Sequence, residues 1–189
     1  MTDDIDLAAA PLDAVAATDF KASGRDPVAD EAALWERFTG SWAGLSESEW
    51  IEPGAAPSDA GGPEWSLLDH VGHCAWWQEI GADYTERILA GGRWPVDDDF
   101  GGGDMDAFNE AQRAEWAGLA SSVVVDRLET SHARLLALVR RAPRDVVENE
   151  AWSDWVTSLL RPHVLDHLRI IEPWAAALRA RRGGAGGSF

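Results

Sequence analysis

Four segments of this chain place large side chains three or four residues apart, which is the spacing of one buried helix face. They span residues 30–45, 66–89 and 107–141, and the fourth begins near Trp152. No segment alternates polar and apolar residues for long enough to form a sheet. The pattern predicts an all-α fold, a four-helix bundle in which residues 95–106 form a long crossover connection between helices 2 and 3.

Local signals refine the helix boundaries. Ser66 followed by Asp69 fits a capping box at the start of the second helix. The third helix is expected to bend near Gly118 or near Ser121 and Ser122. Pro162 and Pro173 donate no backbone hydrogen bond, so we expect them to kink the fourth helix or to split it.

Composition divides the chain into three parts. Residues 1–28 are Ala-rich and acidic and are expected to be flexible, residues 29–182 form the bundle, and residues 183–189 are a flexible Gly-rich tail. The crossover tempts a calcium-loop interpretation, but a loop counted from Asp97 has Phe108 where the bidentate Glu belongs. We expect a solvated connection in which Asp104 or Asp106 caps the next helix.

Charge and cysteine content exclude several functions. The net charge is −17 and Lys21 is the only lysine, which argues against nucleic-acid binding and rules out a phosphate-binding P-loop. No apolar run is long enough to span a membrane, and the first residues lack the features of a secretory signal. A single cysteine, Cys74, fits a reducing compartment. We expect a soluble cytoplasmic protein.

The histidines carry the chemical signal. His163 and His167 are four residues apart and share a helix face, so two imidazoles can approach one ion. A second cluster contains His70 and His73, and one more histidine from a facing helix would complete a three-nitrogen site with open positions. Such a site suits Zn, Ni or Fe as a divalent ion about equally.

At this point the residues match a known family. The segment Trp65–Trp77 (Trp-Ser-Leu-Leu-Asp-His-Val-Gly-His-Cys-Ala-Trp-Trp) resembles the second helix of DinB-like four-helix bundles. The segment His163–His167 resembles the histidine pair of their fourth helix, and Asp106–Asn109 is similar to the branch that contains the ClbS/DfsB proteins and, more distantly, the mycothiol-dependent maleylpyruvate isomerases. The resemblance covers roughly residues 30–182.

The resemblance implies a metal site and a thiol. Carried over residue by residue, the metal ligands are His73, His163 and His167. The mycothiol and bacillithiol S-transferases imply a low-molecular-weight thiol as a second cofactor. Cys74 is expected to be a buried, inert thiol, because adjacent helix residues point about 100° apart and Cys74 therefore turns away from an ion at His73.

Several polar and aromatic residues are candidates for the surroundings of the ion. Asp69 is a better candidate than Asp166 for a carboxylate that orients an imidazole, because Asp166 is adjacent to His167 and points about 100° away from it. The capping role of Asp69 alone could also explain its presence. His70 could be a fourth ligand, a supporting partner or an exposed residue, and we favour the last two. The candidates for a pocket, each of which could equally serve packing or hydrogen bonding, are Trp77, Tyr84, Asn109 and Arg113.

Two classes of function follow. The first is a metalloenzyme, transferase or hydrolase, that activates a thiol or water for S-transfer, isomerisation or hydrolysis of an electrophilic small molecule. The second is a non-catalytic stress-response bundle that binds a metal or ligand and works as a homodimer. Stoichiometric metal in the native protein would favour the first class.

Overall fold

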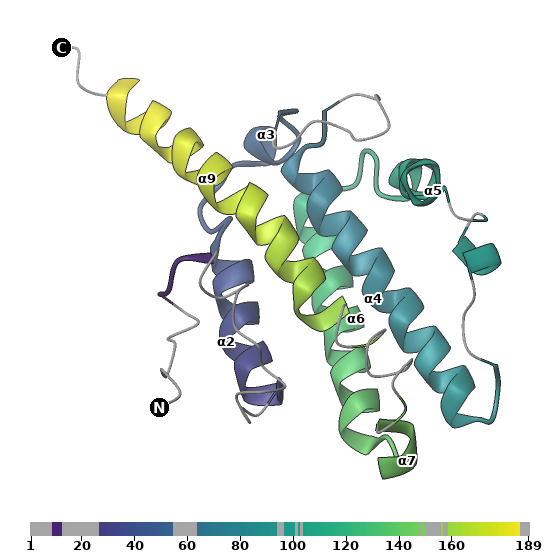
Figure 1. The fold of residues 1–189 in the computed structure, drawn as a ribbon. Helices are drawn as coiled ribbons and strands as arrows, with labels where there is room; N and C mark the ends of the chain where they lie inside the picture. Colours follow the sequence, from purple (N-terminus) through teal and green to yellow (C-terminus); the bar gives the residue numbers. More distant parts are fainter. Residues whose placement is uncertain are drawn as a thin grey trace. The chain divides into compact units, whose positions relative to one another are not determined.

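The computed structural model describes residues 9–12, 27–54, 64–93, 97–100, 102, 104–147, 149, 156 and 159–185. Within them the elements are all helical, as predicted: α2 (Pro27–Gly40), α3 (Glu47–Trp50), α4 (Leu67–Leu89), η1 (Asp97–Phe100), α5 (Met105–Gln112), η2 (Arg113–Glu115), α6 (Ser121–Arg141), α7 (Arg144–Val147) and α9 (Pro162–Ala185) (Figure 1). None of these helices is both long enough and apolar enough to cross a membrane.

The chain divides into two compact units, and we describe each by itself. One contains residues 46–159, and the other contains residues 1–45 together with residues 160–189. Most of the N-terminal segment 1–28, for which we predicted flexibility, lies outside the described residues. Helix α9 extends to Ala185, three residues into the segment predicted as a tail.

Helices α2 and α9 belong to the same unit and are joined by polar contacts. The Arg37 guanidinium donates two hydrogen bonds to the Glu172 carboxylate, at 2.6 and 2.8 Å. Arg179 donates to the carbonyls of Ser41 and Ala43 at 2.7 and 3.0 Å, just beyond the end of α2. These contacts fix the C-terminal end of α2 against α9.

The predicted first helix, residues 30–45, is shifted in the structure. Helix α2 ends at Gly40, five residues earlier than predicted, and a turn follows in which Gly44 has a φ of +75°. The carbonyl of Ser41, which a longer helix would use internally, accepts instead from Arg179. The apolar spacing of Leu34, Phe38 and Trp42 therefore marks a buried face that continues past the end of the helix.

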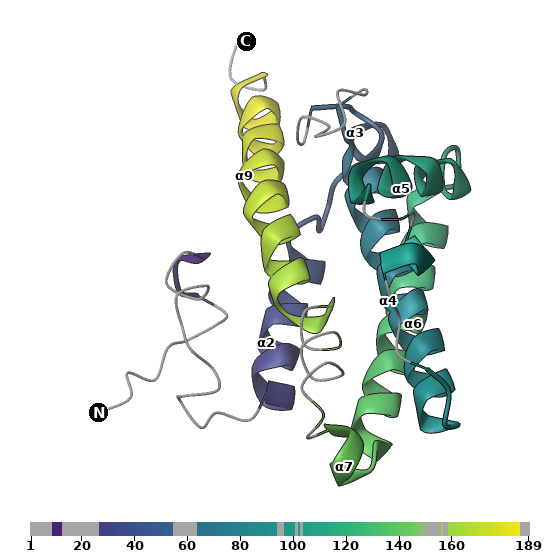
Figure 2. The same ribbon diagram turned by 45° about the vertical axis from the view of Figure 1, so that its right-hand side comes forward.

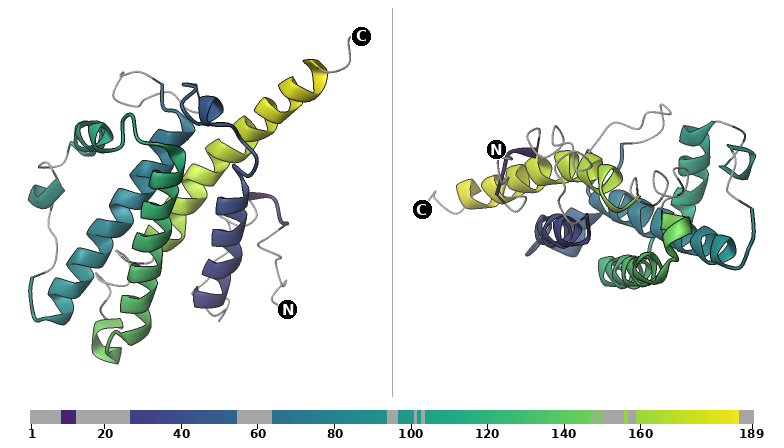
Figure 3. Two further views of the ribbon diagram at one scale, coloured as in Figure 1. Left: turned by 180° about the vertical axis from the view of Figure 1, so that it is seen from behind. Right: turned by 60° about the horizontal axis from the view of Figure 1, so that its bottom comes forward.

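In the other unit, α4 and α6 lie side by side along most of their lengths (Figures 1 and 3). The capping box predicted at the start of α4 is present, with Ser66 accepting from the Asp69 backbone N–H and Asp69 accepting from that of Ser66. Ion pairs cross between the two helices, at 2.6 Å from Arg127 to Glu79 and at 2.8 Å from Arg134 to Glu86.

The single third helix predicted over residues 107–141 is wrong. The structure has α5, the short η2 and a turn that contains Gly118 at a φ of +80°, and only then α6. Two contacts hold the interruption in place. The Trp116 side chain is fully buried, and Glu47 on α3 accepts from the backbone N–H of Ser121 at 2.7 Å.

The prolines have different effects on α9. Pro162 is its first residue, where a missing N–H is one that the helix would leave unused. Pro173 lies inside the helix, which continues through it to Ala185. Pro173 is exposed, so water can reach the backbone carbonyl whose helical hydrogen bond it removes. The predicted fourth-helix start near Trp152 lies outside the described residues.

The crossover passes from α4 to α6 by way of η1 and α5 (Figure 2). Asp104 caps α5 by accepting from the backbone N–H of Ala107 at 3.0 Å, which confirms one of the two predicted caps. Residues 94–96, 101 and 103 of this connection lie outside the described residues.

Candidate metal centre

His163 and His167 lie on the first turns of α9 with their imidazoles facing each other. Their Nε2 atoms are 3.1 Å apart and their ring centroids 4.7 Å apart. Two nitrogens that each lie about 2.0 to 2.1 Å from one zinc ion in a roughly tetrahedral arrangement are about 3.3 Å apart. The pair therefore fits two adjacent positions on a single divalent ion.

Burial sets the protonation of His163. Removal from water lowers the pKa of His163 to about 4, because the charged imidazolium loses its hydration. The imidazole is therefore neutral at physiological pH. A neutral ring is the form that offers a nitrogen lone pair to a metal, so His163 needs no deprotonation before binding.

His73 lies on α4 between two tryptophans. Its ring centroid is 5.1 Å from that of Trp65 and 6.2 Å from that of Trp77, and both pairs are edge-to-face. The His73 side chain is buried. Trp77 thus lies beside the histidine, as predicted from their shared helix face.

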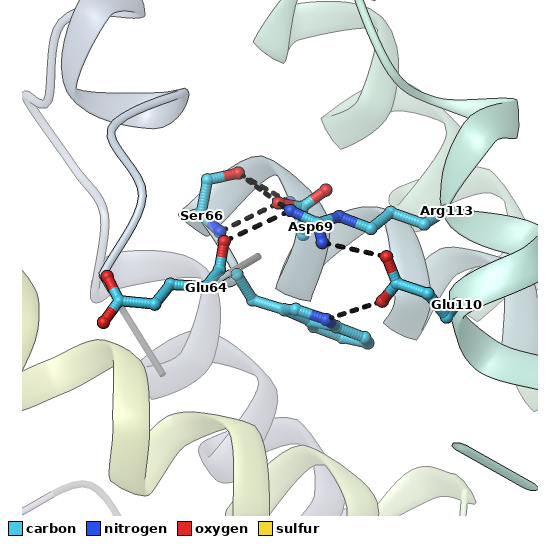
Figure 4. Close-up of polar contacts among 6 residues, drawn as sticks. Glu64, Ser66, Asp69, Glu110 and Arg113 are labelled. Carbon is cyan, nitrogen blue, oxygen red and sulfur yellow. Dashed lines mark hydrogen bonds and ion pairs between the residues drawn. The ribbon is translucent and has the colours of Figure 1, made fainter. Parts of the chain in front are cut away.

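The N-terminal end of α4 carries a polar network, shown in Figure 4. The Asp69 carboxylate accepts from the Ser66 hydroxyl at 2.7 Å and from the Arg113 guanidinium at 2.8 Å. Arg113 also donates to Glu110 at 3.1 Å and to the carbonyl of Glu64 at 3.2 Å. The network ties the start of α4 to α5 and η2.

These contacts define what Asp69 does. Burial alone would raise the pKa of Asp69, but the hydrogen bonds from Arg113 and Ser66 outweigh that effect and hold its pKa below the usual range. The carboxylate is ionised and paired with Arg113. Its observed partners, Arg113 and Ser66, support the capping interpretation of Asp69.

His70 is buried, so the expectation that it might be an exposed residue is wrong. Only 2% of its surface is accessible, and its ring centroid is 5.2 Å from that of Trp65. Burial lowers its pKa to about 4, the charge of Asp69 opposes this shift, and the charge of Arg113 adds to it. The signal that the sequence analysis missed is the tryptophan five residues earlier, which covers the imidazole.

We expect acid to destabilise the metal-free protein through His70. The unfolded histidine has a pKa of about 6.5, so between pH 6.5 and 4 the unfolded chain binds the proton and the folded chain does not. The free energy of unfolding should therefore fall as the pH decreases through this window, by up to about 1.4 kcal/mol per pH unit for this group. Urea titrations in chelator should show a shallower slope for His70→Phe, and an unchanged slope would contradict the assignment.

Tyr84 lies apart from the histidines. It is eleven residues beyond His73 on α4, which corresponds to about 16 Å along the helix axis. It lines a surface pocket of about 420 Å³ together with Arg87 and residues 90–93, and the Arg87 guanidinium lies 4.9 Å from its ring centroid. The structure therefore places Tyr84 in a different pocket from the one the sequence analysis considered.

Asn109, Glu110 and Arg113 all lie on the α5–η2 segment. Asn109 accepts from the Trp77 indole N–H at 3.0 Å, and Glu110 accepts from the Trp65 indole N–H at 3.3 Å. The sequence analysis named Asn109 and Arg113 but missed Glu110. Its position three residues before Arg113, the spacing of a helical ion pair, was the available signal.

Two further residues have structural roles. Cys74 is fully buried, and burial raises the pKa of its thiol far above the usual range. It cannot supply a thiolate at neutral pH. His132 on α6 lies 3.2 Å from the Gln78 side-chain oxygen in the buried face between α4 and α6, and serves packing there.

Comparison with known proteins gives one match. A family model described as the DinB superfamily matches residues 32–171, which include all five histidines. No curated protein and no solved structure matches the chain.

Proposed function

We propose that this chain, which belongs to the DinB superfamily, holds one divalent metal ion through His73, His163 and His167 and uses it to activate an external nucleophile. The observation that carries the proposal is the His163–His167 pair, one half-buried and one buried imidazole with nitrogens 3.1 Å apart. His73 is the histidine that the Trp65–Trp77 segment assigns as the third ligand. Open positions remain for a thiol or water.

The ion would supply Lewis-acid chemistry, which lowers the pKa of a thiol or water and presents it to an electrophile. The protein's own contribution starts with the neutral imidazole of His163 on α9, which binds the ion without first losing a proton. The aromatic rings of Trp65 and Trp77 pack against the His73 imidazole and help to keep it buried from bulk water. The result is a site suited to S-transfer, isomerisation or hydrolysis of a small electrophile.

A thiol nucleophile must come from outside the chain. Cys74 is the chain's only thiol, it is fully buried, and the raised pKa keeps it protonated. A low-molecular-weight thiol such as mycothiol or bacillithiol fits this need, with water as the alternative. We further propose that the two units complete a four-helix bundle and that the protein acts in the cytoplasm.

The test combines metal content with a thiol panel. Purified protein should carry one divalent ion per chain, and metal-loaded protein should turn over a model electrophile such as a chlorodinitrobenzene only when a thiol is added. Cys74→Ser should keep at least about half of this activity, because Cys74 turns about 100° away from His73 on α4. Protein that binds no metal at physiological concentrations would support the non-catalytic alternative, and activity lost with Cys74→Ser at unchanged metal content would exclude the external thiol.

A further inference from the structure

The indole rings of Trp65 and Trp77 pack against His73, and both rings are hydrogen-bonded to helix α5. The Trp77 indole N–H donates to Asn109 at 3.0 Å and the Trp65 indole N–H donates to Glu110 at 3.3 Å. Asn109 and Glu110 are consecutive residues of α5. The crossover helix thus holds both indole rings that contact His73, through two neighbouring side chains.

Helix α5 is itself fixed to the start of α4. Arg113, the residue that follows it, binds Asp69 at 2.8 Å and the Glu64 carbonyl at 3.2 Å (Figure 4). Phe108 packs on Trp76 with ring centroids 5.2 Å apart. These contacts lie on both sides of Asn109 and Glu110 along the chain, so the two anchors are held in register with α4.

We propose that Asn109 and Glu110 are positioning residues that set the orientation of the His73 imidazole through Trp77 and Trp65. The edge-to-face contacts with the two indoles oppose a reorientation of the His73 ring, and each indole is held in turn by a hydrogen bond to α5. The outer partners of a ligand imidazole usually fix its ring orientation and tune metal affinity. Here the outer partners are two anchored indoles.

Helix α5 therefore has a role beyond connecting α4 to α6. Its docking on α4 determines whether His73 presents a nitrogen in one direction or in several. The orientation of His73 rests on contacts within residues 46–159 alone, whereas its consequence for metal affinity rests on the function proposed above.

The test compares Asn109→Leu, which removes the acceptor, with Asn109→Asp, which keeps it. In metal-free protein, the imidazole proton resonances of His73, assigned with His73→Ala, should shift in Asn109→Leu because the Trp77 ring current changes. The Co²⁺ dissociation constant should rise about tenfold. Asn109→Asp should restore both readouts. The same exchange at the exposed Asn149, as Asn149→Leu, should change neither.

A second pair of variants tests the anchor of Trp65. Glu110→Leu should shift the His73 resonances and raise the Co²⁺ dissociation constant, whereas Glu110→Gln, which keeps an acceptor oxygen, should leave both unchanged. Unchanged His73 resonances and Co²⁺ affinity in both leucine variants would overturn the proposal. Equal losses in Asn109→Leu and Asn109→Asp would overturn it as well, because the acceptor would then not matter. If His73→Ala keeps full Co²⁺ affinity, His73 is not a ligand and the three-histidine site proposed above fails, and the resonances of His73 alone decide whether the anchors position it.

Discussion

A His167→Ala variant is expected to lose its bound metal almost completely. His167 contributes one of the two Nε2 atoms that lie 3.1 Å apart, and the substitution leaves His163 without its partner on the same helix. Loss of an outer partner already costs about 10- to 100-fold in metal affinity, so loss of a ligand should cost at least about 100-fold. Metal analysis of the purified variant and Co²⁺ titration measure the effect, and any thiol-dependent activity should disappear with the ion.

The matched control is His132→Gln. His132 is also a buried histidine, but it lies on α6, 3.2 Å from the side-chain oxygen of Gln78 on α4. A glutamine at position 132 can retain a hydrogen bond to Gln78. This variant should keep its metal. Equal metal retention in His167→Ala and His132→Gln would show that the α9 pair holds no ion.

His73→Ala then tests the third ligand separately. His73 belongs to the unit formed by residues 46–159, whereas His163 and His167 belong to the other unit. A loss of affinity comparable to that of His167→Ala would show that both units supply ligands to one ion. Retention of full affinity would restrict the site to α9.

The sequence predicted those features that depend on residues close together in the chain. The Ser66–Asp69 capping box and the His163–His167 pair each span about one helical turn, and both are present as expected. The residues that carry the family resemblance are equally local. A prediction of this kind needs only helix geometry.

The features that the sequence analysis missed depend on contacts between distant residues. The break between α5 and α6 is held by Glu47, which lies 74 residues before Ser121. The anchoring of Trp65 by Glu110 joins residues 45 apart. The sequence around Glu47 or Glu110 does not indicate these roles, because a glutamate on a polar helix face has the same local sequence pattern whether or not it accepts a hydrogen bond from a distant residue. The burial of His70 is an exception, because Trp65, whose ring centroid lies 5.2 Å from that of His70, is close to it in sequence.

The largest stability effect is expected from Gly72→Ala. A Cβ atom at Gly72 would lie 2.5 Å from Cγ of Trp116, and the Trp116 side chain is fully buried and cannot move aside without disturbing its neighbours. Overpacking of this kind costs about 1 to 3 kcal/mol and should outweigh the gain of about 1 kcal/mol from alanine's higher helix propensity. We expect a net loss of up to about 2 kcal/mol, seen as a melting temperature lower by several degrees.

Gly183→Ala provides the matched control, because Gly183 is also helical and no atom lies within 4 Å of the position of its Cβ. Its melting temperature should be unchanged or slightly higher. A double-mutant cycle with Trp116→Phe identifies the cause, since the smaller ring should relieve part of the clash and make the effects of the two substitutions non-additive. If Gly72→Ala matched Gly183→Ala in stability, or if the cycle showed strict additivity, the close approach of Trp116 to α4 would not be what requires glycine at position 72.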